Sequence, residues 1–460
     1  MLPLLKKLLR FLWHLIPRPI RSLMIPSINW LHDLAGDEGT FLVSAKRLDE
    51  ANAKLNQANA KLNQARIQIQ AKAQAVSGQK NYLRERQKKL LWSLRPYHAI
   101  MPKLQKIEDI SDQLRSEVII AVSAESLPYA MAAKGEADTP IFCDATEFPA
   151  LDVRTLIPDW PKSNMKLMNM ALEGYLYECK GIFTVGWELE KSLKKYGTQT
   201  RVIPNYRYAE KLRRSNKLRE EIGLDRNCKI VVAISTIATG MKDVLRALAN
   251  LPSDFHLVVI GNIVPCSYKQ DILDYADELN LKNRFWIVDP VPYSELTSFI
   301  SSADVGLIIR EPGVKNNFVS LPNRIFDYMF AGVPVVTPFM PDINRVITTN
   351  NFGISMEEVT PAEWERSILT AYKNRAELRE SALIAAKKLT WESVEDDLLS
   401  FIGKPKNVTI IGQKNLLKHN RSIRIAKTLA QNGVSVNLAV HEGYISDDVL
   451  DNDTFTVVGY

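Results

Sequence analysis

The spacing of apolar residues changes at about residue 96. From residue 41 to residue 90 an apolar side chain returns at every seventh position, and alanines follow three positions later in the middle of this stretch. The ladder consists of Phe41, Leu48, Leu55, Leu62, Ile69, Val76, Leu83 and Leu90, and the alanines are Ala51, Ala58 and Ala65. Such a repeat is typical of a coiled coil, whose apolar seam is buried only against another helix. Residues 37–95 are therefore predicted to form a coiled coil that joins copies of the chain into a homo-oligomer.

After residue 96, short apolar runs alternate with stretches of helical period. Strand-like runs occupy residues 118–122, 140–143, 181–186 and 200–205, followed by 229–235, 255–261, 284–289, 305–310 and 334–338. This alternation predicts parallel sheets that are covered by helices on both faces. The charged segment 208–227 separates two such units. The predicted fold class is α/β, with Rossmann-like domains at residues 96–208 and 209–403.

Residues 404–460 have the pattern of the first half of such a domain. A strand at 408–411 precedes a helix that contains Ile425 and Leu429, and further strands are predicted at 434–440 and within 453–460. Half a domain would leave strand edges and apolar faces exposed, which is unfavourable. We therefore expect residues 406–460 to complete the sheet built by residues 115–206. The competing interpretation is a second domain copy that is cut short.

The first 36 residues are apolar and basic. They hold Lys6, Lys7, Arg10, Arg18 and Arg21, with no acidic residue before position 33. These bases, together with Pro17, Pro19 and Pro26, interrupt every apolar run, so neither a transmembrane helix nor a signal peptide is predicted. A leucine-rich helix with basic residues on its other side favours binding to an anionic membrane surface. The alternative is a helix that packs on the body of the protein.

Composition and cysteine usage restrict the class of protein further. The formal charge of +7 is modest for 460 residues, so nucleic acid is not an expected partner. The four cysteines are far apart and form no CxxC pair, which fits a reducing cytosol and small buried side chains. The expected location is thus cytoplasmic, peripheral on the inner face of the membrane. No histidine spacing or DxD motif suggests a metal site, so no cofactor and no metal is expected.

The most informative stretch for chemistry is residues 302–347. A strand ends there in a long polar loop, and a helix is predicted from about Leu321 to Gly332. Ligands of open α/β sheets bind beyond the carboxyl ends of strands, and the free N–H groups and dipole of a helix N-terminus suit a diphosphate. Arg310 and Arg324 are placed to add charge-assisted contacts, and Asp327 to accept hydrogen bonds from ribose hydroxyls.

This stretch resembles the donor site of GT-B glycosyltransferases, specifically the retaining family four (glycosyl transferases group 1). The matching motifs are Pro322-Asn323-Arg324, Phe326-Asp327-Tyr328 and Ala331-Gly332-Val333-Pro334-Val335-Val336, together with Ser302-Ala303-Asp304, Trp391 and the segment CDATEFP at 143–149. In order and spacing these motifs cover residues from about 115 to 402. The resemblance implies a nucleotide-sugar donor, transfer with retention, and Asp327 at the position of the ribose-binding glutamate.

Candidate residues are assigned to two roles, catalysis and binding of the nucleotide sugar. Those for catalysis are Asp144, Glu147 and Glu311; those for the nucleotide sugar are Lys242, Arg310, Ser320, Leu321, Asn323, Arg324 and Asp327. As alternatives, Asp144 and Glu147 cap a turn, Lys242 and Glu311 are surface charges, and Asp327 is a solvated carboxylate. The chain departs from the family at Val319, where many members have glutamate, at Thr146, where the family has histidine, and at Ser235 and Thr236, where arginine is expected.

The family usually begins with the strand, helix and strand that this chain carries in residues 404–460. A circular permutation is therefore our hypothesis, and it would bring His419, Asn420 and Arg421 to the acceptor side. The predicted function is a membrane-associated, hexosyltransferase-like enzyme of polysaccharide biosynthesis that acts on a lipid-linked or surface-polysaccharide acceptor. The second hypothesis is an inactive GT-B scaffold that organises a polysaccharide-assembly complex through its coiled coil. A nucleotide-sugar epimerase is the third, and it would need neither coil nor basic segment.

Overall fold

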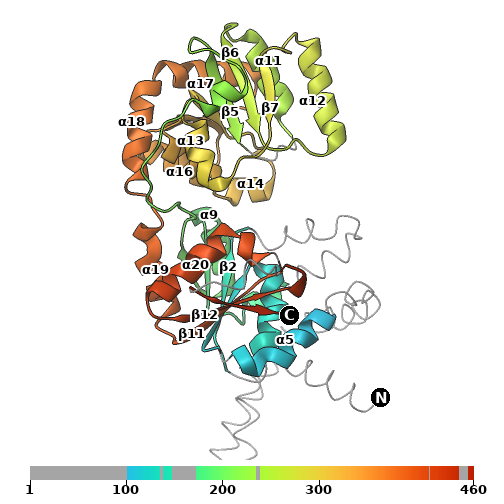
Figure 1. Ribbon diagram of the computed structural model, residues 1–460, viewed down its shortest axis with the longest axis vertical. Helices are drawn as coiled ribbons and strands as arrows, with labels where there is room; N and C mark the ends of the chain where they lie inside the picture. The colour runs from blue at the N-terminus through green and yellow to red at the C-terminus, as the bar shows by residue number, and fades with distance from the viewer. Residues whose placement is uncertain are drawn as a thin grey trace, which may run out of the picture. The chain divides into compact units, whose positions relative to one another are not determined.

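The computed structural model describes residues 101–114, 116–134, 138–147, 172–234, 239–413, 415–444 and 454–460. The basic segment at 1–36 and the predicted coiled coil at 37–95 lie outside these residues. The described part contains two parallel sheets with helices on their faces, as the alternation of apolar runs predicts (Figure 1). Within the described residues, no helix is long and apolar enough to cross a bilayer.

The first sheet has seven strands in the order β13-β12-β11-β1-β2-β3-β4, and every neighbouring pair is parallel. Its strands are β1 (Val118–Val122), β2 (Ile141–Ala145), β3 (Gly181–Thr184), β4 (Gln199–Val202), β11 (Asn407–Ile411), β12 (Ser435–Val440) and β13 (Thr456–Gly459). The last three strands of the chain thus lie side by side and continue the sheet that β1 to β4 form.

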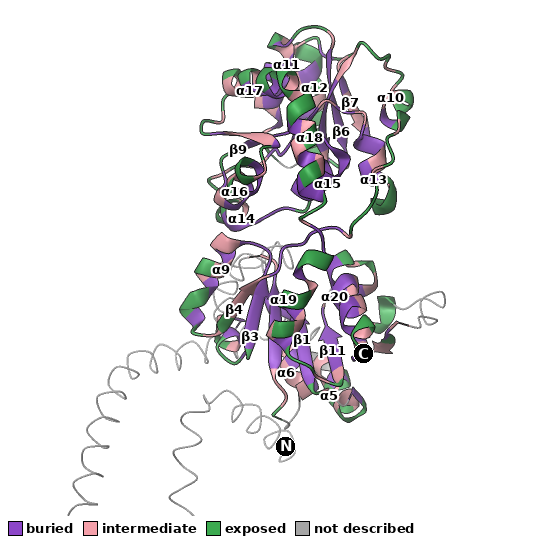
Figure 2. Cartoon of the chain, turned by 90° about the vertical axis from the view of Figure 1, so that its left-hand side faces the viewer, coloured by how far each residue is buried: buried purple, intermediate pink, exposed green. Residues whose placement is uncertain are grey.

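The contact between the two parts of this sheet is the pairing of β11 with β1. Its register runs from Val118 opposite Val408 to Ala121 opposite Ile411. Every residue of β1 is buried, and so are the last four of β11, because these central strands are covered on both faces (Figure 2). This pairing is the one on which the permutation hypothesis depends.

Helices on the first sheet come from both ends of the described chain. They are α5 (Met101–Leu114), α6 (Leu127–Lys134), α9 (Trp187–Leu193), α19 (Glu392–Ile402) and α20 (Asn420–Gln431), with single turns at η2 (Ala124–Ser126), η3 (Lys194–Tyr196), η4 (Leu416–Lys418) and η5 (Glu442–Tyr444). The α19 helix packs here through Phe401, whose ring centroid lies 5.5 Å from that of Phe142 and 6.4 Å from that of Phe183. It therefore delivers the chain from the second sheet to β11.

The second sheet has six strands in the order β10-β9-β8-β5-β6-β7, again all parallel. They are β5 (Lys229–Ile234), β6 (Phe255–Ile260), β7 (Phe285–Val288), β8 (Val305–Leu307), β9 (Val335–Pro338) and β10 (Gly353–Met356). Its helices are α10 (Lys217–Glu221), α11 (Met241–Asn250), α12 (Cys266–Glu278), α13 (Tyr293–Ile300), α14 (Lys315–Val319), α15 (Arg324–Ala331), α16 (Pro341–Thr349), α17 (Pro361–Lys373) and α18 (Arg375–Ala386).

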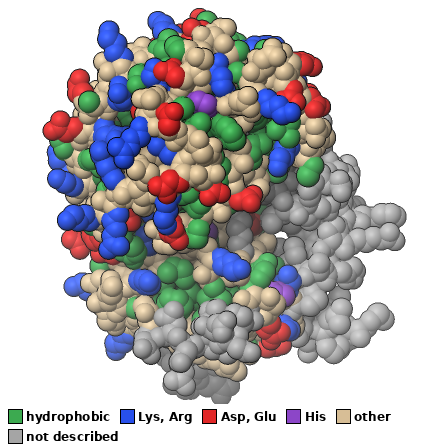
Figure 3. Space-filling model, turned by 45° about the horizontal axis from the view of Figure 1, so that its top comes forward, with side chains coloured by type: hydrophobic (Ala, Val, Ile, Leu, Met, Phe, Trp, Pro, Cys, Tyr) green, Lys and Arg blue, Asp and Glu red, His purple; other side chains and the backbone are tan. Residues whose placement is uncertain are grey.

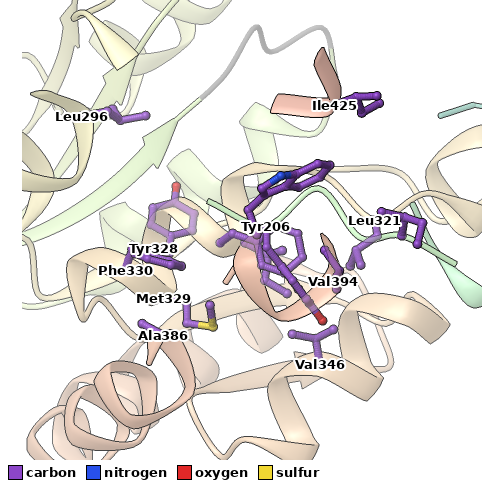
Figure 4. Packing of buried hydrophobic residues seen from close by; sticks show 14 of the residues in the cluster. Tyr206, Leu296, Leu321, Tyr328, Met329, Phe330, Val346, Ala386, Val394 and Ile425 are labelled. Carbon is purple, nitrogen blue, oxygen red and sulfur yellow. The ribbon is translucent and has the colours of Figure 1, made fainter. Parts of the chain in front are cut away.

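The α15 helix is almost completely enclosed. Seven of its eight residues, from Ile325 to Ala331, are buried. Gly332 ends the helix in the left-handed conformation at φ 64°, which costs glycine little, and β9 follows at once. Figure 4 shows Tyr328 and Met329 of this helix within one apolar cluster that also contains Tyr206 and Val394. The first turn of α15 is thus held rigidly by packing.

Two of the four cysteines differ from the expectation of burial. Cys143 and Cys179 are buried within the first sheet and its helices, as expected. Cys228 is half-buried and Cys266, at the start of α12, is exposed, so these two are not core residues.

We predict that a chain ending at Lys404 is insoluble or strongly destabilised. It would lose β11 to β13, so the N–H and C=O groups and the apolar face of β1 would meet water. Soluble yield and thermal melting of the truncated and full chains measure the effect. Co-expression of residues 405–460 as a separate peptide serves as the control and should restore solubility. A truncated chain that stays monodisperse and equally stable would contradict this account of the sheet.

Candidate functional site

The site is built where β8 ends and α15 begins. The N-cap position of α15 is Asn323, which makes no side-chain capping bond. Because the first N–H groups of a helix have no partner in the preceding turn, they point out of the helix as free donors. Among the described residues, no hydrogen bond is seen from the N–H of Leu321, Asn323 or Arg324. This end of α15 is suited to an anion.

Two guanidinium groups flank these donors. Arg310, just beyond β8, donates from Nη1 to the Ser320 hydroxyl at 2.5 Å. Burial, assisted by the positive charge of Arg324, lowers the pKa of Arg310 to about 10. Burial also lowers the pKa of Arg324, which forms no hydrogen bond or ion pair with any described residue. Two half-buried cations next to each other without a bound carboxylate are costly, and a bound dianion would remove that cost.

Two exposed cations elsewhere on the same sheet are paired with carboxylates. On the face drawn in Figure 3, Lys and Arg side chains gather along one side, with Asp and Glu among them. Lys217 lies 3.0 Å from Glu295, and Arg246 lies 3.4 Å from Asp243. Arg324 has no such partner among the described residues.

Glu147 approaches the same loop from the first sheet. Its carboxylate accepts a hydrogen bond of 3.2 Å from the Asn316 side chain on α14, and its charge raises the pKa of Arg310 against the effect of burial. The structure thus brings together a predicted catalytic acid and two predicted nucleotide-binding residues, Arg310 and Ser320.

Asp327 lies one turn into α15 and is bound to a residue that the sequence did not single out. Arg207, which follows β4, donates from Nη1 to Oδ1 of Asp327 at 2.7 Å, and both side chains are buried. Burial raises the pKa of Asp327, and the charge of Arg207 acts against that shift. The interpretation of Asp327 as a solvated carboxylate is wrong, because only 5% of its surface is exposed.

Lys242 and Glu311 lie together at a separate hollow. With Thr239, Gly240, Asp243 and Tyr268 they line a surface pocket of about 310 Å³. Lys242 is 41% exposed and forms an ion pair with Asp271 at 2.8 Å, which raises the pKa of its ammonium group. Its charge is thus already neutralised in this conformation, whereas Glu311 is exposed and its carboxylate lies at the pocket.

Asp144 and Arg421 differ most from their expected roles. Arg421 donates from Nε to both carboxylate oxygens of Asp144, at 2.9 and 2.8 Å, and from Nη1 to the Ile203 carbonyl at 2.9 Å. Both side chains are fully buried, with 0% and 1% of their surface exposed. An acceptor cannot reach either group here, so their placement corrects the expectation of a catalytic Asp144 and an acceptor-facing Arg421. The pair instead joins α20 to β2.

The other predicted site residues of the segment 404–460, called the tail below, lie at the start of α20. His419 caps this helix: its Nδ1 accepts from the Ser422 N–H at 3.4 Å and lies 2.7 Å from the Ser422 hydroxyl. Asn420 is exposed at the first helical position. Of the predicted acceptor-side residues, Asn420 therefore remains accessible and His419 has a structural partner.

Leu321 and Asn323 have partners within the protein. The Leu321 side chain belongs to the apolar cluster and is 3% exposed, so only its backbone is available to a ligand. The Asn323 side chain accepts a hydrogen bond of 2.7 Å from the Asn205 amide. Asn205 also contacts Arg424 of α20, so this chain of polar contacts connects the first turn of α15 to the tail helix.

Asp342 is a further acidic group that sequence reasoning missed. It lies at the start of α16 and accepts hydrogen bonds from the Glu188 N–H at the start of α9, at 3.1 and 3.3 Å. Gly186 permits this approach, because a Cβ there would lie 2.3 Å from the carboxylate. Burial raises the pKa of Asp342 to about 6, with Glu188 adding to the shift and Arg345 opposing it. The contact links loops at the carboxyl ends of β3 and β9.

Sequence signals for the missed residues were weak. Asp342 follows a proline at a helix start, where acidic residues are common, and this was the one available hint. Arg207 lies 120 positions from Asp327, and no local pattern reports such a pairing. In the described residues, no group of His, Cys, Asp and Glu side chains is arranged to hold a metal ion.

Comparisons with known proteins place this geometry in context. Residues 214–389 match the family described as Glycosyl transferases group 1. Over 203 residues the chain is 21% identical to the D-inositol 3-phosphate glycosyltransferase of Corynebacterium glutamicum (strain R), which covers 41% of this chain and 46% of that protein. The chain thus spans about half the length of that curated relative.

Solved structures superpose on a larger share of the chain. Sucrose-phosphate synthase (tll1590) from Thermosynechococcus elongatus does so with a TM-score of 0.51 at 15% identity, covering 62% of this chain and 73% of that one. Anabaena Alr3699/HepE in complex with UDP gives a TM-score of 0.52 at 16% identity, covering 65% of this chain and 81% of that one. At these identities the superpositions show the shared fold.

We predict that Arg421→Met lowers the free energy of unfolding by about 3–5 kcal/mol, because Asp144 would remain as a buried charge without its partner. Chemical denaturation measures the loss. The double variant Asp144→Leu with Arg421→Met should recover part of it, since no charge is then left buried. Arg201→Met, which breaks an exposed pair with Asp397, is the control and should cost less than about 1 kcal/mol. Equal losses for both arginines would contradict the prediction.

Asp342 should make stability depend on pH between about 4 and 6. Its pKa in the folded protein is about 6, above the value of about 4 for an exposed aspartate, so the folded state binds its proton more tightly. The stabilisation from this group is complete below about pH 4 and is lost as the pH rises through about 6. The melting temperature of the wild type minus that of Asp342→Asn, measured from pH 4 to pH 8, should decrease as the pH rises through about 6 and then stay constant. Asp397→Asn, at an exposed position, is the control and should show no such difference.

Proposed function

We propose that the chain transfers a sugar from a nucleotide sugar to an acceptor, because residues 214–389 match the glycosyl transferases group 1 family. The carrying observation is the pair Arg310 and Arg324 at the N-terminus of α15. Their lowered pKa values and the lack of a carboxylate bound to Arg324 leave positive charge for which a diphosphate is a fitting partner.

The donor is proposed to lie along α15. Its diphosphate would contact Arg310, Arg324 and the free N–H groups near Asn323, and its ribose would contact Asp327. Solved relatives are complexes with UDP and with UDP-glucose, which supports a uridine nucleotide as the first one to test. As the sugar–phosphate bond breaks, these cationic and N–H groups would stabilise the charge on the departing diphosphate. No step in this scheme requires a metal ion.

The acceptor is proposed to bind against the first sheet. The order of its strands reverses between β11 and β1, and ligands of open α/β sheets bind beyond the carboxyl ends of strands at such a point. Glu147 is the predicted catalytic acid that fits best, because it lies near Arg310 across from α15. Glu311, exposed at the pocket with Lys242, is proposed to contact the donor sugar. Retention of configuration and a hexose as the sugar are carried over from the family resemblance.

The second candidate function is an inactive scaffold on the same fold. It is favoured by the ion pair of Lys242 with Asp271, because this pair engages a cation that is expected to bind the diphosphate. It is also favoured by Val319 and Thr146, which stand where the family has glutamate and histidine. Hydrolysis of a nucleotide sugar in the absence of acceptor separates the two candidates: an enzyme shows slow turnover that the scaffold lacks.

We also propose that the first sheet is circularly permuted relative to the family. Support comes from β11, β12 and β13, which supply the strand, helix and strand with which such sheets usually begin. The matched family domain at 214–389 is itself continuous, so the permutation would concern only the first sheet. The truncation after Lys404 described above tests this arrangement against a separate second copy.

Attachment to an anionic membrane, self-association and an acceptor in lipid-linked or surface polysaccharide remain proposals from sequence. They rest on the bases in residues 1–36 and on the apolar ladder in residues 37–95. Sedimentation with and without anionic vesicles, for the full chain and a chain lacking residues 1–95, tests the first two. Binding or oligomers that survive this deletion would overturn them.

We predict that Arg310→Met and Arg324→Met each weaken binding of a nucleoside diphosphate by about tenfold or more, the usual effect of losing a hydrogen bond to a charged group. Isothermal titration and thermal shift with UDP, GDP and ADP measure this effect. Binding of the nucleosides without phosphate should change little. Arg246→Met, at an exposed position on α11, is the matched control. A wild-type protein that binds none of these nucleotides would overturn the proposed donor site.

A further inference from the structure

The contact between Arg207 and Asp327 is asymmetric. On the arginine side every nitrogen is engaged: Nη1 donates to Asp327 at 2.7 Å, Nε to Glu210 at 3.1 Å, and Nη2 to the Tyr293 carbonyl at 3.3 Å. The guanidinium also lies 4.0 Å from the centre of the Tyr293 ring. On the aspartate side only Oδ1 is bound, and among the described residues nothing donates a hydrogen bond to Oδ2.

The backbone of Arg207 is fixed as well. Its carbonyl accepts the Trp391 N–H at 2.7 Å, so the segment after β4 is tied to the segment that leads into α19. The neighbouring ring of Tyr206 packs edge-on against Phe326 of α15, with 4.9 Å between centroids. Figure 4 shows Tyr206 beside this helix. The guanidinium is thus a rigid support for one oxygen of the carboxylate.

A purely structural ion pair would be expected to satisfy both carboxylate oxygens. A buried charge is costly unless its remaining lone pairs accept hydrogen bonds. Here one oxygen of a carboxylate in the first turn of α15 is left over, close to the N-terminus where the donor diphosphate is proposed to bind. Every side-chain nitrogen of Arg207 thus has a partner within the protein, whereas Oδ2 of Asp327 has none among the described residues and can accept from a ligand.

We propose that Arg207 is a positioning residue for the nucleotide: it holds Oδ1 of Asp327 and so directs Oδ2 to accept hydrogen bonds from the ribose hydroxyls. Arg207 itself does not touch the nucleotide. The proposal rests on the proposed donor site and adds to it a residue from the segment between the two sheets.

Arg207 has a second effect, on the charge of Asp327. Burial raises the pKa of this carboxyl, whereas Arg207, Arg324 and Arg424 lower it, and Tyr293 and Tyr328 are the other titratable groups beside it. A carboxylate accepts hydrogen bonds from hydroxyls more strongly than a neutral acid. Without Arg207, Asp327 should take up its proton at a higher pH. Ribose recognition should therefore be lost at a higher pH when the solution is acidified.

The experiment compares UDP with 2′,3′-dideoxy-UDP, which lacks the two hydroxyls. The dissociation constant of the dideoxy compound divided by that of UDP isolates ribose recognition, because titration of the phosphates is common to both ligands. It is measured by calorimetry from pH 5 to pH 8.5, with GDP or ADP and the corresponding dideoxy compound if one of these binds better. In the wild type this ratio should exceed one, and it should decrease as the pH is lowered.

In Arg207→Met the decrease of the ratio should occur at a pH that is higher by about one unit or more, which is the usual effect of an opposite charge at this distance. Arg207→Lys, which keeps the charge, should remain near the wild type in pH dependence with a smaller ratio. Asp327→Asn should give a ratio near one at every pH. Arg201→Met is the control for loss of an arginine and should not shift this decrease. Melting curves show which variants are folded, and Arg207→Gln replaces Arg207→Met if the latter is not.

The outcomes separate the two levels of inference. If the wild type binds no nucleotide, the proposed donor site fails. If it binds both ligands equally, Asp327 does not recognise ribose, and the role of Arg207 falls with it while the donor site stands. If the wild type prefers UDP and Arg207→Met lowers affinity equally at all pH values, the arginine is merely structural and this proposal alone is overturned.

Discussion

The buried pair of Asp144 and Arg421 is the constraint on which the first sheet depends. Both charges are removed from water, and among the described residues each forms an ion pair with the other alone, although they lie 277 positions apart in the chain. If the tail were absent, Asp144 would be a buried carboxylate without a cation, and β1 would be an edge strand. The apolar register between β1 and β11 aligns the tail, and the ion pair penalises any register in which α20 is displaced. Residues 404–460 are thus an integral part of the domain.

On the second sheet the balance of charge is reversed. Buried or half-buried cations outnumber the carboxylates near the start of α15, where Arg310 has a hydroxyl partner and Arg324 has none. A protein that is only marginally stable retains such a surplus at a cost, and a bound anion recovers it. The two places differ: Asp144 and Arg421 neutralise each other, whereas Arg324 has no carboxylate partner among the described residues. The match of residues 214–389 to the glycosyl transferases group 1 family is consistent with an anion at this position.

Sequence patterns predicted the elements well where the physics is local. The apolar run at 118–122 is β1 with the same bounds, since a fully buried parallel strand is apolar throughout. The helix expected from about Leu321 begins at Arg324; Pro322 disfavours helical geometry at Leu321, and Asn323 is the N-cap. The strand expected at 305–310 ends at Leu307, and β10 was not predicted because its four residues GISM carry no clear alternation. Within the site, the resemblance identified α15 and its cations. The partners of Asp144, Lys242 and Asp327 depend on contacts between distant segments, which periodicity does not report.

The segments between the two sheets connect these observations. Arg207 binds Asp327 of α15 through its side chain and the Trp391 segment through its backbone, while Asn205 contacts both Asn323 of α15 and Arg424 of α20. A ligand that engages the first turn of α15 therefore acts on residues whose other contacts lie on the first sheet and its tail. Asp342 makes a second connection of this kind to α9. Since α20 lies within residues 404–460, these residues contribute to the sheet through β11 and to the surroundings of the proposed donor site through Arg424. The position of α20 relative to the first turn of α15 is thus set in part by the contacts of Asn205 with Asn323 and Arg424.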